Sequence, residues 1–252
     1  MRRLACAAGI RIYAAWVAGP VPGQQGGYAM DTIFRGGLGT ASGRRRAWID
    51  SMLVDHGVLR LAWTNAGAVV PGRLYRCNHP TPGRLSAMVR RWGIRSVLNL
   101  RGPTGNGSDA LSRERAHLLG LDFIDMPMSS GRPPPRERLL ALIAALQTLR
   151  APGLVHCKSG ADRAGFAGAV FLLLQGEPVA TAMRQLSLRW GHLARSRAGV
   201  LDAVLAAYAR EGEGRVPFAD WVRDFYDPDA IAAGFTAGSL DTLLNDRLLR
   251  RE

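Results

Sequence analysis

The sequence predicts an α/β fold in which helices flank a central, mostly parallel sheet, followed by a helical C-terminal part. Between residues 74 and 176, short apolar runs alternate with amphipathic segments, a pattern typical of a parallel sheet covered by helices. The composition is that of a globular protein, with 47% hydrophobic and 21% charged residues. The 252 residues allow one or two domains, and the sequence shows neither a repeat nor a second compositional region, which favours one.

We expect residues 1–43 to form a weakly ordered N-terminal extension and residues 44–252 to form the domain, whose helical portion begins near residue 177. The stretch 12–30 is uncharged, but its prolines, glycines and glutamines do not suit a membrane-spanning helix. Three cysteines that lie far apart in the chain argue against a disulfide scaffold and suit a reducing compartment. The sequence therefore predicts a cytoplasmic protein without a transmembrane segment.

Local signals predict the first elements of the domain. Apolar side chains share one helical face at Ala47, Trp48, Met52 and Leu53. The alternation over 58–63 predicts a strand, and another strand begins near Leu74. Thr81 suits a helix N-cap, Pro82 suits the first turn and Gly93 suits the end, so a helix is expected between them.

Strands and helices then alternate along the chain. Compact apolar runs predict strands at 94–100, 121–126 and 153–156. Ser108 is expected to open a helix that Gly120 closes, and three consecutive prolines mark 127–135 as a loop. Further helices are predicted at 139–149, 164–174, 178–190, 197–210, 217–226 and 239–250.

The segment with the clearest chemistry consists of a strand, His156 and Cys157, five further residues, Arg163 and a helix. A tight loop at a helix N-terminus points backbone N–H groups inward and adds the positive end of the helix dipole. Gly160 permits the sharp turn, and Arg163 offers a planar fork for two phosphate oxygens. Because such surroundings stabilise a thiolate, the loop predicts attack by Cys157 on a bound tetrahedral anion.

The pattern His156-Cys157-x-x-Gly160-x-x-Arg163 resembles the signature of the cysteine-dependent protein tyrosine phosphatases. The upstream segments PGRLYRCNHPTP and GIRSVLNLRG are similar to the entry strands and first helix of compact bacterial and atypical dual-specificity members. This resemblance covers about residues 44–176 and implies the family's mostly parallel sheet flanked by helices. It also implies hydrolysis of phosphate monoesters through a cysteinyl-phosphate intermediate, without a metal or any other cofactor.

The resemblance assigns roles to individual residues. Cys157 is the implied nucleophile and Arg163 the implied phosphate clamp, while His156 tunes the thiolate and orders the loop. Backbone N–H groups are implied to bind phosphate oxygens along the loop, from Lys158, Ser159, Gly160, Ala161, Asp162 and Arg163. Family members usually follow the arginine with a hydroxyl that helps the thiolate leave. Ala164 occupies that position here, so the second step is expected to be slow or to be assisted differently.

The general acid is the second departure from the family. Members usually carry an aspartate in the loop that corresponds to 127–135, where this sequence has no carboxylate. We favour Asp162, because it lies within the phosphate loop and a general acid must come within hydrogen-bond reach of the leaving oxygen. A bacterial subset that the chain resembles carries the same Asp-Arg pair and is thought to use that aspartate. Asp125, at a strand end, is the other candidate. The structural alternatives are an ion pair with an arginine for Asp162 and a solvated strand end for Asp125.

The charge of the chain bears on its partners. Thirty-three basic and 20 acidic residues give a net charge of +13, which suits attraction to anionic surfaces or is simply a solvated, arginine-rich surface. A phosphotyrosine or dual-specificity protein substrate is the first expectation. A phospholipid, phosphoinositide or lipid-linked sugar phosphate is the second, suggested by Lys158 and the missing loop carboxylate. A phosphate-binding pseudophosphatase without turnover is the third.

Two further classes of function are not expected. The aromatic residues near the C-terminus fall on helical positions that suit core packing rather than nucleic-acid stacking, so we expect no nucleic-acid partner. The histidines show no metal-ligand spacing, so we expect no bound metal.

Overall fold

A computed structural model describes residues 32–235 of the chain. Residues 1–31 and 236–252, including the helix predicted at 239–250, lie outside the described residues. A compact unit includes the chain from Thr32 onward, because Phe34 is buried beside Ala47 and Leu111. The domain boundary predicted near residue 44 remains a prediction.

A five-stranded sheet forms the centre of this unit, in the order β1-β2-β5-β3-β4. Its strands are β1 (Gly67–Val70), β2 (Leu74–Cys77), β3 (Ser96–Asn99), β4 (Asp122–Asp125) and β5 (Gly153–His156). Strand β1 runs antiparallel to β2, and the other four strands are mutually parallel. His156 in β5 is paired with Cys77 in β2 on one side and with Asn99 in β3 on the other. The predicted mostly parallel sheet is thus confirmed, and its parallel strands end along one carboxyl edge.

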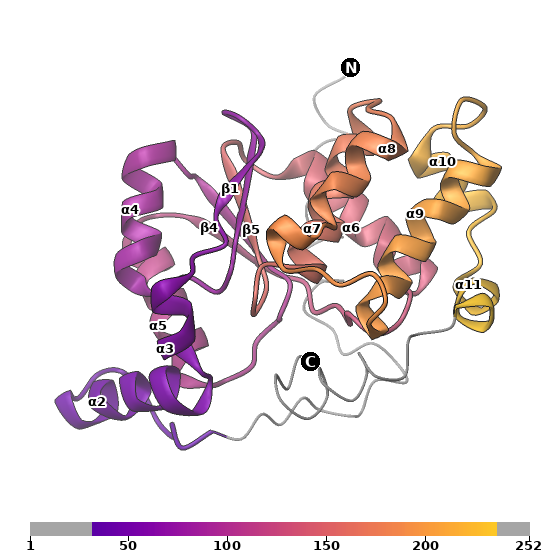
Figure 1. Cartoon of the computed structure of the whole chain (residues 1–252). Coiled ribbons are helices and arrows are strands. Elements are labelled where there is room, and N and C mark those ends of the chain that lie inside the picture. The colour runs from indigo at the N-terminus through magenta and orange to yellow at the C-terminus, as the bar shows by residue number, and fades with distance from the viewer. Residues whose placement is uncertain (1–31, 236–252) are drawn as a thin grey trace. The chain divides into compact units, whose positions relative to one another are not determined.

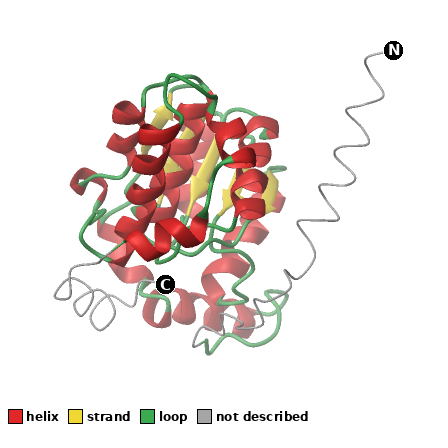
Figure 2. Ribbon diagram, turned by 90° about the vertical axis from the view of Figure 1, so that its right-hand side faces the viewer, coloured by secondary structure: helices red, strands yellow, loops and turns green. Residues whose placement is uncertain are grey.

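Helices cover both faces of the sheet (Figure 1). They are α2 (Ala41–Ile49), α3 (Gly57–Ala62), α4 (Pro82–Trp92), α5 (Gly107–Leu118), α6 (Arg136–Thr148), α7 (Asp162–Leu174), α8 (Val179–Ala182), α9 (Val200–Glu211), α10 (Phe218–Asp224) and α11 (Pro228–Gly234). Short helical turns are η1 (Asp50–Val54), η2 (Met183–Gln185), η3 (Leu188–Trp190) and η4 (Arg197–Gly199). The predicted helical C-terminal part is confirmed as far as residue 235, and Figure 2 shows the strands enclosed by helices. No helix within residues 32–235 is long and apolar enough to cross a bilayer.

The core has one layer on each side of the sheet. On one side α4 and α5 pack against the strands through a cluster that includes Tyr75, Leu85, Met88, Val97 and Leu154. On the other side α7 is buried over nearly its whole length, between the sheet and the C-terminal helices (Figure 1). A helix that is apolar all round must be covered on every side, which explains why α6, α9 and α10 pack around it.

Helix α4 confirms its sequence prediction at both ends. The Thr81 hydroxyl accepts the N–H of Arg84 (3.5 Å), and Gly93 ends the helix with a φ of +65°. Helix α5 begins at Gly107, one residue before the predicted Ser108, because Asn106 is its N-cap and accepts the N–H of Asp109 (2.9 Å).

The predicted strand at 58–63 is wrong, since residues 58–62 belong to α3 and the first strand begins at Gly67. The alternation suggested that apolar side chains point inward. Instead Val58, Leu59 and Leu61 are exposed, while Arg60 is buried. Arg60 is buried because it binds Asp55, a pairing that a hydropathy pattern does not reveal.

Asp55 anchors the N-terminal helices to the sheet. Its carboxylate is 1% exposed and accepts hydrogen bonds from Arg60 (2.7 Å) and from Arg101 (2.8 and 3.0 Å), in the loop after β3. Burial opposes ionisation of Asp55, but Arg101 and Arg60 outweigh it and hold the pKa of Asp55 well below its usual range. The segment that contains α3 is therefore attached to the carboxyl edge of the sheet by a buried ionic network.

We predict that Asp55→Asn lowers the free energy of unfolding by about 3–5 kcal/mol, because the buried Arg60 and Arg101 would lose the charge of this carboxylate. Urea unfolding measures the change. The matched control is Asp122→Asn, whose ion pair with Arg150 is about half exposed on both sides and should contribute less than about 1 kcal/mol. A similar loss in both variants would contradict the role of Asp55.

Candidate active site

The predicted phosphate loop connects β5, in the middle of the sheet, to α7. Cys157 follows the last residue of β5 and is 1% exposed, while Lys158 and Ser159 are half-buried. The backbone N–H of Gly160 points at the sulfur, with 3.3 Å between the nitrogen and Sγ. The loop thus folds around its cysteine, at the carboxyl edge of the sheet.

Groups outside the loop bind four successive loop carbonyls. The N–H of His79 donates to the Lys158 carbonyl (3.2 Å), and the Asn65 side chain donates to the Ser159 carbonyl (3.0 Å). Arg76 donates to the carbonyls of Gly160 (2.5 Å) and Ala161 (3.0 Å). In a trans peptide the C=O and the next N–H point in opposite directions. The N–H groups of residues 159–162 are therefore turned away from these outer donors, and the Gly160 N–H on Sγ shows that direction directly.

Gly160 is required by the close approach of two loops. Its φ is +74°, a left-handed conformation that favours glycine. A Cβ at this position would lie 2.6 Å from the Asn78 nitrogen and 2.7 Å from the Cys77 carbonyl carbon. The backbone after β2 therefore supports the phosphate loop only because residue 160 has no side chain.

Arg76 is the central support of the loop. It lies in β2, is fully buried, and also donates to the backbone and side-chain oxygens of Gln185 (2.6 and 2.8 Å). Its guanidinium carbon lies 4.3 Å from the centre of the Trp190 ring. Burial lowers the pKa of Arg76 to about 10, opposed by the neighbouring Cys157 and Asp162. The guanidinium thus stays charged at neutral pH, close to Cys157.

Arg163 and His156 flank the loop in different ways. Arg163, in the first turn of α7, is 8% exposed and donates to the Met128 carbonyl (3.2 Å) in the loop after β4. His156 is fully buried, and its ring meets the His79 ring edge-on at 4.9 Å. Burial lowers the pKa of His156 to about 3, and Arg101 acts in the same direction. His156 is therefore neutral.

Asp162 is held by a histidine rather than by an arginine. Its Oδ1 lies 2.8 Å from His192 Nδ1, and His192 Nε2 lies 2.6 Å from a carboxylate oxygen of Asp202. Burial lowers the pKa of His192, but the hydrogen bonds that its ring donates to the carboxylates of Asp162 and Asp202 outweigh burial and raise this pKa to about 9. At neutral pH a protonated imidazole therefore links two aspartates, one of which belongs to the phosphate loop.

Asp125, the other acid candidate, is also bound. It ends β4, where its carboxylate forms an ion pair with Arg113 (2.7 Å) and accepts a hydrogen bond from Asn99 (2.9 Å). Its side chain is 23% exposed. The structure thus places Asp162 inside the loop and Asp125 at the end of a strand two positions away in the sheet.

Four residues of this site carried no role in the sequence interpretation: Asn65, Arg76, His192 and Asp202. Arg76 had a usable signal, because a charged residue inside a short buried strand must have partners. His192 had no such signal in the sequence, because its partners Asp162 and Asp202 lie 30 and 10 residues away and match no known motif spacing. Within residues 32–235, no three His, Cys, Asp or Glu side chains converge as a metal site, and the expected metal independence remains a prediction.

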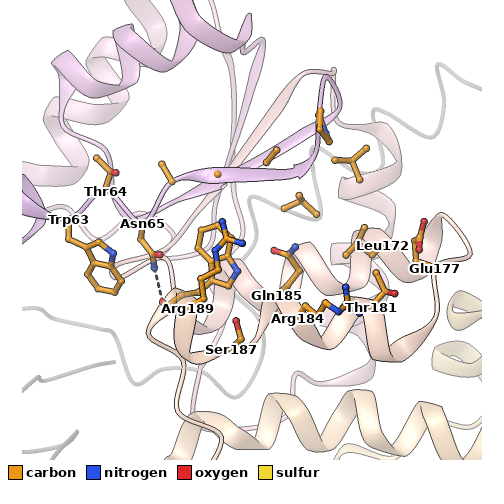
Figure 3. A pocket seen from close by; sticks show the side chains of 17 residues that line it. Trp63, Thr64, Asn65, Leu172, Glu177, Thr181, Arg184, Gln185, Ser187 and Arg189 are labelled. Atoms are coloured by element: carbon orange, nitrogen blue, oxygen red, sulfur yellow. Dashed lines mark hydrogen bonds between the residues drawn. The ribbon is translucent and has the colours of Figure 1, made fainter.

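A cavity of ≈ 840 Å³ lies beside the supports of the loop. It extends from Trp63 and Asn65 at one end to Thr181 and Glu177 at the other (Figure 3). Its wall includes Trp190, whose carbonyl accepts a hydrogen bond from Asn65 (2.8 Å). Residues 157–163 do not line it, so this cavity borders the outer side of the loop through Asn65 and Trp190.

We predict that the stabilising effect of His192 depends on pH. Its folded pKa of about 9 lies above the ordinary value of 6.5, so its protonated form stabilises the fold most below pH 6.5, by roughly 3 kcal/mol. This contribution is lost as pH rises through about 9. The difference in unfolding free energy between wild type and His192→Gln should therefore shrink over that interval, as measured by urea unfolding. The exposed His117→Gln control should show no such trend, and a constant difference for His192 would contradict the assignment.

The family model for the Swiss Army Knife protein, DSP-PTPase phosphatase domain (PTP-SAK), matches residues 64–198, more than half of the chain. No curated protein matches the sequence. Two similar solved structures are P. aeruginosa TpbA and the core catalytic domain of the PP-IP phosphatase SIW14 from S. cerevisiae, crystallised with citrate, each 21% identical. The TpbA match has a TM-score of 0.48 and covers 67% of this chain and 91% of TpbA. The SIW14 match has a TM-score of 0.42, with 67% and 89% covered. On the family match, this chain belongs to the PTP-SAK family of dual-specificity-type, cysteine-based phosphatase domains.

Proposed function

We propose that the protein hydrolyses phosphate monoesters, with Cys157 as the nucleophile and a cysteinyl-phosphate as the intermediate. The observation that carries the proposal is the outward binding of the four carbonyls from Lys158 to Ala161. The N–H groups that follow these carbonyls point the other way, and those other than the Ala161 N–H, which donates to Ser159 Oγ, can stabilise charge on a phosphoryl group. Preorganised donors of this kind commonly supply a large share of catalysis.

The reaction has two steps. The Cys157 thiolate attacks phosphorus, the bond from phosphorus to the leaving oxygen breaks, and a general acid protonates that oxygen. Water then attacks the cysteinyl-phosphate, the S–P bond breaks, and inorganic phosphate and the thiolate result. Arg163 is proposed to hold two of the phosphoryl oxygens, which its planar guanidinium suits. Cys77 is not a competing nucleophile, because burial raises the pKa of its thiol well above the usual value.

We propose Asp162 as the general acid, with His192 as its proton source. The carboxylate of Asp162 lies in the loop, next to Arg163, whereas Asp125 is bound by Arg113 and Asn99. The imidazolium of His192 passes its proton to the Asp162 carboxylate along their shared hydrogen bond as Asp162 protonates the leaving oxygen, which leaves His192 neutral. Asp202 stabilises the charged imidazole from its other side.

The second step is proposed to be the slower one. Ala164 is fully buried and has no hydroxyl to assist the departing sulfur. Ser159 carries the nearest hydroxyl along the loop, and its Oγ accepts the N–H of Ala161 (3.3 Å). This contact supports a structural role for Ser159 within the turn.

A phosphotyrosine or dual-specificity protein substrate is the first candidate, in keeping with the dual-specificity type of the domain. A lipid phosphate is the second, favoured by exposed apolar side chains of α3 beside the carboxyl edge of the sheet. Both described cysteines, Cys77 and Cys157, are free thiols, which supports the proposed cytoplasmic location.

We predict that wild-type protein hydrolyses p-nitrophenyl phosphate and that Cys157→Ser lowers kcat by several orders of magnitude, because the nucleophile is lost. Cys77→Ala is the matched control and should retain activity. Phosphotyrosine peptides and lipid phosphates, assayed in parallel, decide between the two substrate classes. Phosphate binding by wild type and Cys157→Ser without hydrolysis by either would contradict the enzymatic proposal and favour a binding module.

We predict that Asp162→Asn lowers kcat by about 10²–10⁴ on phenyl phosphate, whose leaving oxygen needs a proton. The same variant should have a much smaller effect on p-nitrophenyl phosphate, whose leaving group is stable as an anion. Asp125→Asn, the control, should affect both substrates equally and weakly. The opposite result, with the leaving-group dependence confined to Asp125→Asn, would assign the acid to Asp125.

A further inference from the structure

Exposed apolar side chains are concentrated in one segment of the chain. Of the eleven large hydrophobic residues that are exposed within residues 32–235, eight lie between residues 33 and 63. They are Ile33, Trp48, Ile49, Leu53, Val58, Leu59, Leu61 and Trp63. Most lie on α2, η1 and α3, and η1 contacts both of these helices. A soluble surface rarely gathers so many large apolar groups without binding a partner.

The same segment is basic on its surface. Arg35, Arg45 and Arg46 are exposed, and Arg44 is half exposed in an ion pair with Glu114. Asp50 and Asp55 are the only acidic residues between Thr32 and Thr64, and both are buried. Asp50 accepts hydrogen bonds from the N–H groups of Ile33 and Gly107, and Asp55 binds Arg60 and Arg101. The exposed part of this segment therefore presents apolar and positively charged groups without an acidic one.

This segment is attached to the edge of the sheet that carries the phosphate loop. The Trp63 carbonyl accepts a hydrogen bond from Asn78, directly after β2, and Asn65 binds the Ser159 carbonyl of the loop. Arg84, in α4, donates to the carbonyls of Arg60 and Leu61. These hydrogen bonds hold the segment that carries α3 in a fixed position relative to the phosphate loop.

We propose that this basic apolar surface, defined by the eight hydrophobic residues above with Arg35, Arg45 and Arg46, docks on an anionic lipid bilayer. Apolar side chains that enter the interface, together with cations that meet acidic headgroups, are the chemistry of interfacial binding. An acidic bilayer complements the positive charge of this surface. A second copy of the chain would present the same positive charge and repel it. The docking is independent of the proposed catalysis, and it would place the phosphate loop near membrane-borne phosphate groups.

Sedimentation of the full chain with vesicles tests this proposal. Binding should be strong to phosphatidylcholine vesicles that contain phosphatidylglycerol and weak to phosphatidylcholine alone. Leu59→Ser combined with Leu61→Ser should lower the partition by about tenfold or more, as should Arg45→Gln combined with Arg46→Gln. The matched controls are Leu118→Ser, exposed on α5, and Arg90→Gln with Arg91→Gln, exposed on α4; these should bind like wild type.

Other results would overturn the proposal. The protein could bind neutral and anionic vesicles equally, or bind neither. The surface variants and the control variants could lose vesicle binding equally. The protein could also form a dimer in solution that Leu59→Ser dissociates. Hydrolysis of p-nitrophenyl phosphate in solution should stay within about twofold of wild type in every surface variant, since none touches the phosphate loop. The vesicle assay needs no turnover, so a failure of the proposed catalysis would leave its result interpretable.

Discussion

The buried guanidinium of Arg76 is the interaction on which the site depends. A charge at that depth is costly unless it is hydrogen-bonded, and the two terminal nitrogens of Arg76 donate to carbonyls of the phosphate loop and to oxygens of Gln185. The loop in turn needs an outside donor to keep its carbonyls away from the cysteine. Arg76 thus gains acceptors for its charge, and the loop gains a donor for its carbonyls. The same hydrogen bonds connect strand β2, the loop and the segment around Gln185.

Local signals predicted much of the sheet and several helices. Helix α4 was predicted to the residue, because Thr81 and Gly93 act within one turn of its ends. Strand β5 and the loop after it followed from a short motif. The failure at 58–63 has a different origin: Arg60 is buried by a partner elsewhere in the chain, and the neighbouring apolar residues are exposed. Hydropathy patterns assume that apolar side chains point inward, and here that assumption does not hold.

The site was predicted only where its residues are close in sequence. The motif indicated Cys157, Gly160 and Arg163 as a loop, and the structure places these residues together. Arg76 and Asn65 reach the same loop from 84 and 94 residues away. The role of Asp162 depended on His192 and Asp202, whose pairing only the folded chain brings about. Sequence patterns thus indicated the residues of the loop, while the groups that hold the loop in position came from long-range packing.

The region that matches the family covers residues 64–198. Two of the carboxylates that bind buried cations lie outside it. Asp55 precedes it and binds Arg101, and Asp202 follows it and binds His192. A fragment trimmed to the matched region would keep Arg101 and His192 but lose Asp55 and Asp202, so that His192 would keep Asp162 alone of its two aspartates. The smallest autonomous catalyst is therefore longer than the family signature, and its flanking helices are part of the charge balance of the enzyme.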